Sequence, residues 1–290
     1  MKKIGMVGVG LMGQGIATNL VRHGHQLAVF DHPGNQPLDT LRAAGVQVMA
    51  DLPALAARSE LIFLVLTGSP AVEAVLTGER GVLQGLRPGT VVIDCSTALP
   101  ASTRRMAQAV AAAGGRFLDA PMTRTPKEAA EGRLNLLLGG DAQLLEACRP
   151  VLACFAENIT HAGPVGAGHS MKLLHNFVSL GMVTLLAEAA ACAQRSGVAP
   201  EAFVEVLAKG GGGGIALERL KPFVLGQDPS GLRFSLANAQ KDLGYYQTMA
   251  REAGAHAAVA AAVLATLDEG VSRAPAGAWV PELVRVLSQR

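Results

Sequence analysis

A polar stripe interrupts an otherwise apolar segment in the second half of the chain. Its four members recur at spacings of i, i+3, i+4 and i+7, namely Lys172, His175, Asn176 and Ser179. In a helix, these spacings place the side chains on one face. A positioned lysine ammonium can donate a proton to a carbonyl oxygen and stabilise the charge that develops there. The stripe therefore favours acid–base chemistry by Lys172, with Asn176 orienting the lysine or a substrate.

Two interpretations of this stripe differ in the surroundings that they give to its side chains. Burying polar side chains costs free energy unless they line a wet or ligand-filled cleft. The functional interpretation places the stripe in a cleft between two domains, where it faces a substrate. The alternative is a solvated helix end, at which Lys172 lays its methylene groups on apolar neighbours and extends its ammonium into water.

A glycine-rich turn follows the first apolar run of the chain. The segment reads Gly8-Val9-Gly10-Leu11-Met12-Gly13 and stands between a predicted strand and a predicted helix. The first glycine permits the tight turn, the second lets the backbone approach a pyrophosphate, and the third permits close packing of helix and strand. The helix N-terminus offers free N–H groups and a positive dipole end to the phosphates. The residues expected to contact a dinucleotide are Gly8, Gly10, Leu11, Met12 and Gly13.

An acidic residue favours this interpretation over an incidental glycine-rich turn. Asp31 ends the second predicted strand, 18 residues beyond Gly13, where a carboxylate can accept hydrogen bonds from the hydroxyls of the adenosine ribose. The same carboxylate would repel a 2′-phosphate, and no arginine lies between Asp31 and Leu41 to receive one. The sequence therefore predicts NAD as the cofactor in preference to NADP.

The elements that position these residues change in kind along the chain. From Lys2 to about His161, short apolar runs alternate with helical patterns such as Gln14–His23 and Pro100–Ala113. The expected strands are Lys3–Val7, Gln26–Phe30, Val46–Met49, Leu61–Leu66, Val91–Asp94, Arg116–Leu118, Leu134–Leu138 and Asn158–Thr160. This alternation is typical of a parallel sheet covered on both faces. We therefore expect an α/β domain at residues 1–163, with a doubly wound, Rossmann-type sheet.

The strand-like runs stop after Pro164, where segments rich in Ala, Leu and Glu replace them. The expected helices are Met171–Ser196, Pro200–Leu207, Ala237–Ala253, Ala257–Leu267 and Val280–Leu287. The Gly210–Gly214 run is typical of a loop between helices. We therefore expect residues 164–290 to form an all-α domain for substrate binding and oligomerisation.

Composition excludes several classes of function. The chain has 290 residues, of which 50% are hydrophobic and 17% charged, and its net charge of +2 gives no sign of a nucleic-acid surface. The first residues lack the pattern of a secretory signal, which predicts a cytoplasmic protein. The four cysteines and seven histidines show no metal-ligand spacing, so we expect reduced core thiols and no metal. The apolar run Phe177–Ala193 contains Ser179, Thr184 and Glu188, which favours a buried helix over a membrane span.

Several further motifs occur in the order found in one family of dehydrogenases. They are Asn19-Leu20, Asp94-Cys95-Ser96-Thr97 with Pro100, Asp119-Ala120-Pro121, Gly139-Gly140, Gly166-Ala167-Gly168, Lys172 with Asn176, and Lys241-Asp242-Leu243. With the glycine-rich turn, they make the chain resemble the β-hydroxyacid dehydrogenases from end to end. This is the family of 3-hydroxyisobutyrate dehydrogenase and tartronate semialdehyde reductase, and it is related to 6-phosphogluconate dehydrogenase.

The resemblance implies roles for particular residues. Leu66, Thr67 and Thr97 would lie along the nicotinamide half of the cofactor, although the family usually has proline where Thr67 stands. Lys241 would approach the cofactor from the helical domain, and Lys172 matches the catalytic lysine of the family. Family members commonly pair through their helical domains, so a homodimer or homotetramer is expected.

The chain departs from the family in the expected substrate loop. Family members continue with Ser-Gly-Gly after Asp-Ala-Pro, whereas this chain reads Met122-Thr123-Arg124-Thr125. The guanidinium of Arg124 is a permanent, forked donor for an oxyanion, and the segment resembles the Gly-Arg-Thr loop of sulfolactaldehyde reductases. Alternatively, Arg124 forms a weak, partly exposed ion pair with Glu128 or Glu131. The expected substrate-binding residues are Ser96, Thr123, Arg124, Thr125, Lys172 and Asn176.

These features together predict an oxidoreductase that transfers a hydride between NAD(H) and a small anionic 3-hydroxy acid or its semialdehyde. Lys172 would be the general acid and base, and a strongly anionic head group such as a sulfonate stays open. The alternatives are a non-catalytic NAD-binding sensor and an imine reductase. Imine reductases share the architecture but generally carry another residue at the position of the lysine.

Overall fold

The computed structural model describes residues 1–289, and the chain divides into two compact units. The first unit comprises Met1–Lys172 and the second comprises Leu173–Arg290. The expected division at residues 163 and 164 precedes helix α8 (Ala167–Arg195), whereas the compact units divide inside that helix. The beginning of α8, up to and including Lys172, therefore belongs to the first unit.

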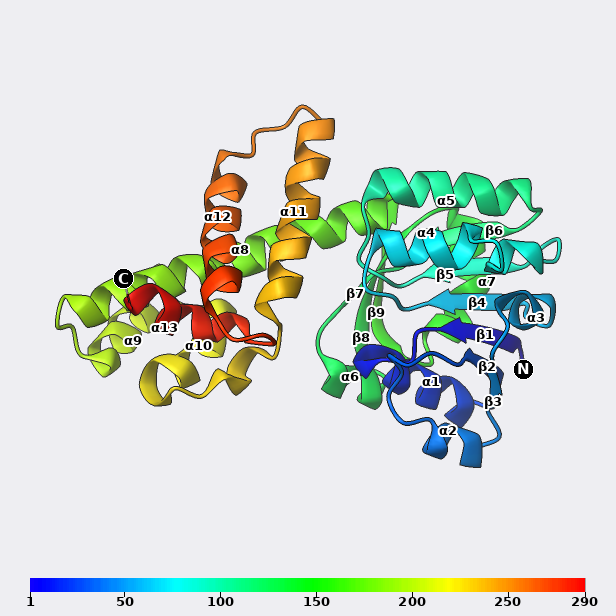
Figure 1. Cartoon of the computed structure of the whole chain (residues 1–290), viewed down its shortest axis with the longest axis horizontal. Helices are drawn as coiled ribbons and strands as arrows, with labels where there is room; N and C mark the ends of the chain where they lie inside the picture. Colours follow the sequence, from blue (N-terminus) through cyan, green and yellow to red (C-terminus); the bar gives the residue numbers. More distant parts are fainter. Residues whose placement is uncertain (290) are drawn as a thin grey trace. The chain divides into compact units, whose positions relative to one another are not determined.

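A nine-stranded sheet forms the centre of the first unit (Figure 1). Its strands are β1 (Lys3–Val7), β2 (Gln26–Phe30), β3 (Gln47–Met49), β4 (Leu61–Leu64), β5 (Val91–Asp94), β6 (Arg116–Asp119), β7 (Met122–Thr123), β8 (Leu134–Gly139) and β9 (Ala156–Gly163). They lie in the order β3-β2-β1-β4-β5-β6-β8-β7, and β9 pairs with β8. In the sheet, the six neighbouring strands β3, β2, β1, β4, β5 and β6 are parallel to one another. This is the doubly wound, Rossmann-type order, whose switch point lies between β1 and β4.

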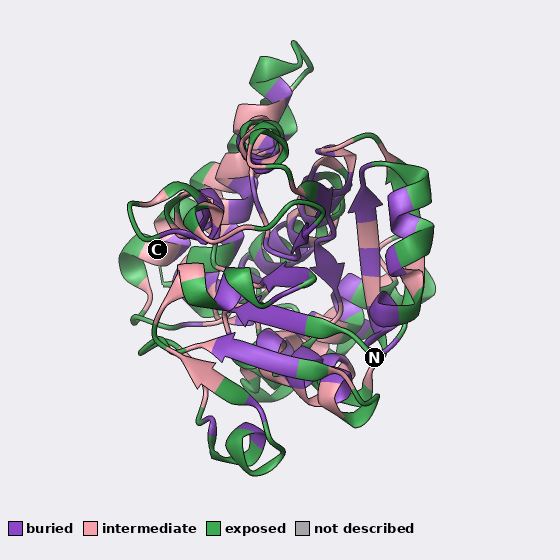
Figure 2. Ribbon diagram, turned by 90° about the vertical axis from the view of Figure 1, so that its right-hand side faces the viewer, coloured by how far each residue is buried: buried purple, intermediate pink, exposed green. Residues whose placement is uncertain are grey.

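Helices cover both faces of this sheet (Figure 1). They are α1 (Leu11–Arg22), α2 (Asp39–Ala43), α3 (Leu52–Ala57), α4 (Ser69–Thr77), α5 (Pro100–Ala112), α6 (Pro126–Glu131) and α7 (Ala142–Leu152). Buried side chains of α1, α6 and α7 pack in one cluster, and those of α3, α4 and α5 pack in another. Strands between two such layers are apolar throughout, and every residue of β4 is buried. Several strands of the sheet accordingly appear as buried along most of their length in Figure 2, whereas most of β9 is exposed.

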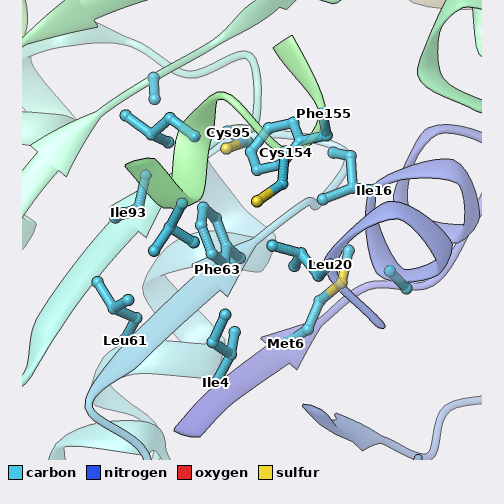
Figure 3. Packing of buried hydrophobic residues seen from close by; sticks show 14 of the residues in the cluster. Ile4, Met6, Ile16, Leu20, Leu61, Phe63, Ile93, Cys95, Cys154 and Phe155 are labelled. Atoms are coloured by element: carbon cyan, nitrogen blue, oxygen red, sulfur yellow. The ribbon is translucent and has the colours of Figure 1, made fainter. Parts of the chain in front are cut away.

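The tightest part of the core surrounds an aromatic pair. Phe63 of β4 and Phe155 meet edge to face, with their ring centroids 5.5 Å apart and their planes at 83° (Figure 3), a geometry that adds to the stability gained from burial alone. Met6 of β1 and Ile16 and Leu20 of α1 belong to the same cluster. This packing holds β1 against α1 and so fixes the turn between them.

Within residues 173–289, the second unit is helical. After the rest of α8 come α9 (Pro200–Lys209), α10 (Ile215–Gly226), α11 (Leu236–Glu252), α12 (Ala258–Arg273) and α13 (Leu283–Ser288). Its core brings Val183 of α8 together with Phe223 of α10, Leu243 of α11, Leu267 of α12 and Leu283 of α13. All of the strands are thus in the first unit, as the change of pattern after Pro164 predicted.

Helix α8 is more exposed than its apolar sequence suggested. Among the described residues it is the one helix long and apolar enough to span a membrane, and 44% of its most apolar window is buried. One side of α8 carries an exposed apolar stripe, formed by Leu174, Val178, Met182 and Leu185. Cys192 is exposed on the same helix, so the prediction that all four cysteines are core thiols was wrong for this residue.

The differences between expected and observed elements have local causes. Strand β7 has two residues and is too short to show an alternating pattern. Helix α10 was missed because it contains Pro222, which normally argues against a helix interior. Helix α1 begins at Leu11 instead of Gln14, so Gly13 lies inside the helix.

Candidate active site

The loops expected at the cofactor site lie along one edge of the sheet. The parallel strands β1, β4, β5 and β6 end in register, through the pairs Val7–Leu64, Leu64–Asp94 and Asp94–Asp119. The segments that follow these strand ends include the glycine-rich turn, Leu66–Thr67 and Ser96–Thr97. Open α/β sheets bind their ligands outside this edge, at the switch point.

The glycine-rich turn has the shape that a dinucleotide requires. Gly8 has a φ of +99°, and a Cβ on it would lie 2.2 Å from the carbonyl oxygen of Val65. A Cβ on Gly13 would lie 2.1 Å from the carbonyl oxygen of Gly8, whereas a Cβ on Gly10 would meet no atom within 4 Å. The space beside Gly10 is open, and α1 begins there without a side chain capping its N–H groups. These groups fit a pyrophosphate.

One residue that holds this turn was missed from the sequence. The side chain of Asn35 accepts a hydrogen bond from the N–H of Val9 at 3.0 Å and donates to the carbonyl of Phe30 at 2.9 Å. The N–H of Gln36 donates to the carbonyl of Val9 at 2.8 Å. The loop after β2 thus braces the glycine-rich turn. In the sequence, Asn35 follows a Pro-Gly pair that indicates a surface turn. This local pattern does not reveal that its partner is Val9, 26 residues away.

Four of the predicted cofactor residues, Asp31, Leu66, Thr67 and Thr97, occupy exposed or partly exposed positions after the strands of this edge. Asp31 is exposed directly after β2, and its N–H donates to the carbonyl of Met49 at 2.8 Å. Thr67 is exposed, and Leu66 and Thr97 are partly buried. The backbone of Asp31 is therefore fixed while its carboxylate stays accessible to a ribose.

Ser96, expected on the substrate side, connects two loops of the edge. Its hydroxyl accepts the N–H of Leu66 at 3.0 Å, and its own N–H donates to Asp94 at 2.9 Å. The side chain is buried. Ser96 therefore fixes the segment that carries Thr97 relative to the segment that carries Thr67.

The beginning of helix α8 is held at the same edge by Asp119. This buried carboxylate accepts the N–H of Gly166 at 2.8 Å and the N–H of His169 at 2.9 Å. A Cβ on Gly168 would lie 2.8 Å from Asp119 Oδ2 and 2.3 Å from a neighbouring carbonyl oxygen, which explains the glycine. Lys172 lies one turn beyond His169 and is buried.

The rest of the polar stripe divides by exposure. Asn176 is buried, Ser179 is partly buried and His175 is exposed. His175 Nδ1 lies 3.0 Å from Asn176 Oδ1. Lys172 and Asn176 are thus the two buried members of the stripe, four residues or about one turn apart on α8.

In the second unit, Asn176 is bound by an acidic side chain to which the sequence had given no role. Asn176 Nδ2 donates to Asp242 Oδ2 at 2.7 Å, and Lys241 Nζ lies 3.1 Å from Asp242 Oδ1. Asp242 is buried, so these contacts offset part of the cost of burying its charge. The Lys241-Asp242-Leu243 triplet was visible in the sequence, but its spacing could not identify Asn176 as the partner.

The residues of the expected substrate loop have structural partners. The Thr123 hydroxyl accepts from Asn135 Nδ2 at 3.0 Å. Thr125 is the N-cap of α6 and forms a capping box with Glu128. Between them, Arg124 has a φ of +80°, a left-handed conformation that favours glycine. The glycine that family members usually carry here therefore matches the backbone of this loop.

Arg124 pairs with a carboxylate, but not with either of the two expected. Its Nη1 donates to Glu157 of β9 and to the carbonyl oxygen of Arg133. Glu128 is engaged with Thr125, and Glu131 pairs with Arg133 at 3.2 Å. The predicted partners were wrong because β8 and β9 bring a residue distant in sequence beside the loop.

Burial and hydrogen bonding shift the pKa values of several side chains in the first unit. The Arg124 guanidinium holds the pKa of the Glu157 carboxyl below its usual range. Burial raises the pKa of the Asp94 carboxyl and that of the neighbouring Cys95 thiol. Cys95 is therefore a neutral core thiol rather than a nucleophile. Among residues 1–289, no group of three or more His, Cys, Asp or Glu side chains is arranged to hold a metal.

The sheet is mixed, since β8 runs antiparallel to β6 and β7 and so departs from the expected parallel sheet. Its parallel part, from β3 to β6, with a glycine turn after β1, is the architecture of dinucleotide-binding proteins. Comparison with known proteins agrees. Residues 3–163 match the NAD binding domain of 6-phosphogluconate dehydrogenase, and residues 166–287 match the NAD-binding model of NADP-dependent 3-hydroxyisobutyrate dehydrogenase.

Individual relatives cover most of the chain. The 2-(hydroxymethyl)glutarate dehydrogenase of Eubacterium barkeri is 34% identical over 87% of this chain and 82% of that protein. The 3-sulfolactaldehyde reductase of Escherichia coli is 38% identical over 66% of this chain and 63% of that protein. A Mycobacterium tuberculosis 3-hydroxyisobutyrate dehydrogenase solved with L-serine superposes with a TM-score of 0.88, at 28% identity, over 99% of both chains. The chain belongs to the β-hydroxyacid dehydrogenase family and is an NAD(P)-binding oxidoreductase.

Two glycine substitutions should separate cofactor binding from folding. Gly10→Ala adds a methyl group to open space, so the free energy of unfolding of the apoprotein should be unchanged, while the Kd for NADH should rise about tenfold, or roughly 1.4 kcal/mol. Gly13→Ala should instead destabilise the apoprotein by about 1–3 kcal/mol, because its methyl group collides with the Gly8 carbonyl. Urea unfolding and fluorescence titration measure the two effects. Equal losses of stability in both variants would contradict this assignment.

Proposed function

We propose that this enzyme interconverts a small anionic 3-hydroxy acid and its semialdehyde, with NAD(H) as the redox partner. The observation that carries the proposal is the attachment of α8 to the carboxyl edge of the sheet. Because Asp119 binds the N–H groups of Gly166 and His169, Lys172 is fixed close to the loops that follow β5 and β6. A buried lysine one turn from that anchor supports a catalytic role over a solvated helix end.

The residues divide the reaction into hydride transfer and proton transfer. Bound NAD(H) supplies or accepts the hydride at its nicotinamide ring. In reduction, the Lys172 ammonium donates a proton to the aldehyde oxygen as that oxygen gains charge. In oxidation, the neutral amine of Lys172 takes the proton from the alcohol. Hydride and proton together account for the two hydrogens that convert the aldehyde to the alcohol.

Asn176 is suited to orient this chemistry. Its amide nitrogen is already committed to Asp242 at 2.7 Å, which limits rotation of the side chain. The amide oxygen is then held in a fixed direction, 3.0 Å from His175 Nδ1, and its second lone pair can accept a further hydrogen bond. A fixed acceptor one turn from Lys172 can align the lysine ammonium or the substrate hydroxyl.

The anionic head group is assigned to the loop that carries Arg124. Only Nη1 of the guanidinium is engaged in the contacts with Glu157 and the Arg133 carbonyl. The remaining N–H groups of the fork can therefore bind two oxygens of one anion. The named activities of relatives support this substrate class, because 2-(hydroxymethyl)glutarate, 3-sulfolactaldehyde and 3-hydroxyisobutyrate are all small anions. A sulfonate is one candidate head group, because a relative that is 38% identical over 66% of this chain is a 3-sulfolactaldehyde reductase.

We also propose that the enzyme is a soluble cytoplasmic homodimer or a larger homo-oligomer. The exposed stripe of α8, formed by Leu174, Val178, Met182 and Leu185, recurs at helical spacing and gives one continuous apolar face. Burial of that face between two copies would remove it from water. Light scattering on the purified chain measures the number of copies directly.

Lys172→Ala tests the assignment of the acid and base. The variant should bind NADH as the parent does, and its kcat should fall by about 10²–10⁴, the usual contribution of a positioned general acid. Lys221→Ala, which removes a partly exposed lysine on α10 that pairs with Glu218, is the control and should leave turnover unchanged. Turnover of Lys172→Ala within a few-fold of the parent would exclude this mechanism. A parent that binds NADH but turns over neither hydroxy acids nor imines would be a sensor.

Asp31→Asn tests the preference for NAD. The substitution leaves one neutral acceptor oxygen for the ribose hydroxyls in place of a charged carboxylate, and it removes the repulsion of a 2′-phosphate, so the ratio of kcat/KM with NAD to that with NADP should fall about tenfold. Asp39→Asn, an exposed carboxylate on α2, should leave the ratio as it is. An unaltered ratio in Asp31→Asn would remove Asp31 from the cofactor site.

Arg124→Gly tests the head-group assignment. The expected result is a larger loss of kcat/KM for sulfolactate than for 3-hydroxyisobutyrate or glycerate, by about tenfold, because a charged bidentate contact is lost. The pKa of Glu157 should rise toward its ordinary value once the guanidinium is gone, which NMR titration measures. Glu157→Gln is the control, because it releases Arg124 from its carboxylate and should keep the preference for sulfolactate. Equal losses across the three substrates in Arg124→Gly would overturn the assignment.

A further inference from the structure

A buried histidine lies at the centre of a polar cluster that the mechanism above does not use. The ring of His169 is fully buried. Its Nε2 lies 3.1 Å from the carbonyl oxygen of Ser96, and its Nδ1 lies 2.7 Å from the hydroxyl of Thr103. A carbonyl oxygen only accepts hydrogen bonds, so Nε2 carries the proton of the first contact. His169 thus joins the start of α8 to the loop after β5 and to α5.

Two carboxylates flank the same ring. Asp94 Oδ2 lies 3.9 Å from His169 Nε2, and Asp119 Oδ2 lies 3.8 Å from Nδ1. Both carboxylates are fully buried. Among residues 1–289, Asp94 Oδ2 is one of three buried side-chain atoms without a hydrogen-bond partner, and the His169 ring is a polar neighbour 3.9 Å away. Replacing the ring by an apolar side chain would remove that polar neighbour from a buried carboxylate oxygen.

The contacts of His169 connect the two parts of the first unit that the reaction uses. On one side, Ser96 holds the Leu66 N–H with its hydroxyl and precedes Thr97 in the chain. On the other side, His169 lies three residues before Lys172 on α8. The bond from the ring to the Ser96 carbonyl therefore sets the distance between the segment assigned to nicotinamide and the helix assigned to the proton donor.

We propose that His169 is a positioning residue, which holds the Ser96–Thr97 segment and the start of α8 in one fixed arrangement. Asp119 accepts hydrogen bonds from backbone N–H groups at the start of α8, whereas the side chain of His169 bonds this helix to the loop after β5. Together, the two contacts restrict both sliding and rotation of the helix. The consequence for catalysis rests on the proposed function of Lys172. The structural coupling does not depend on that function.

Two substitutions of His169 and one control test the coupling in the apoprotein. His169→Leu removes the bond to the Ser96 carbonyl, and His169→Gln keeps a neutral donor of similar length. Thr90→Val is the control, because Thr90 is buried at the other end of β5 and donates to the Ser59 carbonyl at 3.2 Å. Hydrogen exchange of the Ser96, Leu66 and Gly166 amides is measured in each purified variant.

The expected result is specific to these three amides. Their exchange should become about tenfold faster in His169→Leu, should recover at least in part in His169→Gln, and should stay at the parental rate in Thr90→Val after correction for global stability. Unchanged exchange in His169→Leu, or equal acceleration in Thr90→Val, would overturn the proposal. If His169→Leu does not fold, His169→Asn takes its place, because its amide is polar but too short to reach the Ser96 carbonyl, and parental exchange together with a parental kcat in that variant overturns the proposal as well.

Steady-state kinetics then test the catalytic consequence. Displacement of the proton donor should lower kcat by about 10- to 100-fold in His169→Leu, while the Kd for NADH stays close to the parental value because the glycine-rich turn is untouched. An enzyme that shows the exchange effect but no hydroxy-acid turnover, even in the parent, would refute the proposed function and leave the coupling established. A parental kcat in His169→Leu alongside faster exchange would refute the catalytic consequence alone.

Discussion

Two N–H groups at the start of one helix donate to a single buried carboxylate, that of Asp119. A carboxylate in the interior is costly without such donors, and helix N–H groups without partners are costly as well, so each side satisfies the other. Because β6 ends in register with β5, β4 and β1, this contact also relates α8 to the glycine-rich turn. The position of Lys172 depends on it, and so does the need for a glycine at position 168.

The site combines residues of two physical kinds. The groups expected to contact a dinucleotide are backbone N–H groups and an exposed carboxylate, which need little support beyond the shape of the turn. The group assigned to orientation, Asn176, is a side chain whose direction another side chain fixes, because Asp242 binds it within the second unit. In the first unit, Asn35 binds the glycine-rich turn itself. Each unit therefore relies on polar contacts of its own as well as on its packed core.

The sequence predicted the features that are encoded locally. The spacing of Gly8, Gly10 and Gly13, the strand ends and the change to helices after Pro164 are all readable within a short window. The contacts of Glu157, Asp242 and His169 were not readable, since each partner lies between 33 and 73 residues away. Such pairs become visible only once the strands and helices are assembled. Thr123 and Thr125 were predicted as substrate-binding residues because of their hydroxyl groups. In the structure these hydroxyls also have structural roles, since Thr125 caps α6 and Thr123 bonds Asn135.

Arg124 is an arginine whose usefulness depends on a residue of another strand. A non-glycine residue at a φ of +80° is disfavoured by about 1–2 kcal/mol, so the loop is less stable with an arginine here than it would be with a glycine. The carboxylate of Glu157 gives the guanidinium a partner and a direction. The acidic residue on β9 is therefore the one that makes an arginine usable at this position. Transfer of this arginine to a relative without the acidic residue would accordingly reproduce the strain without the orientation.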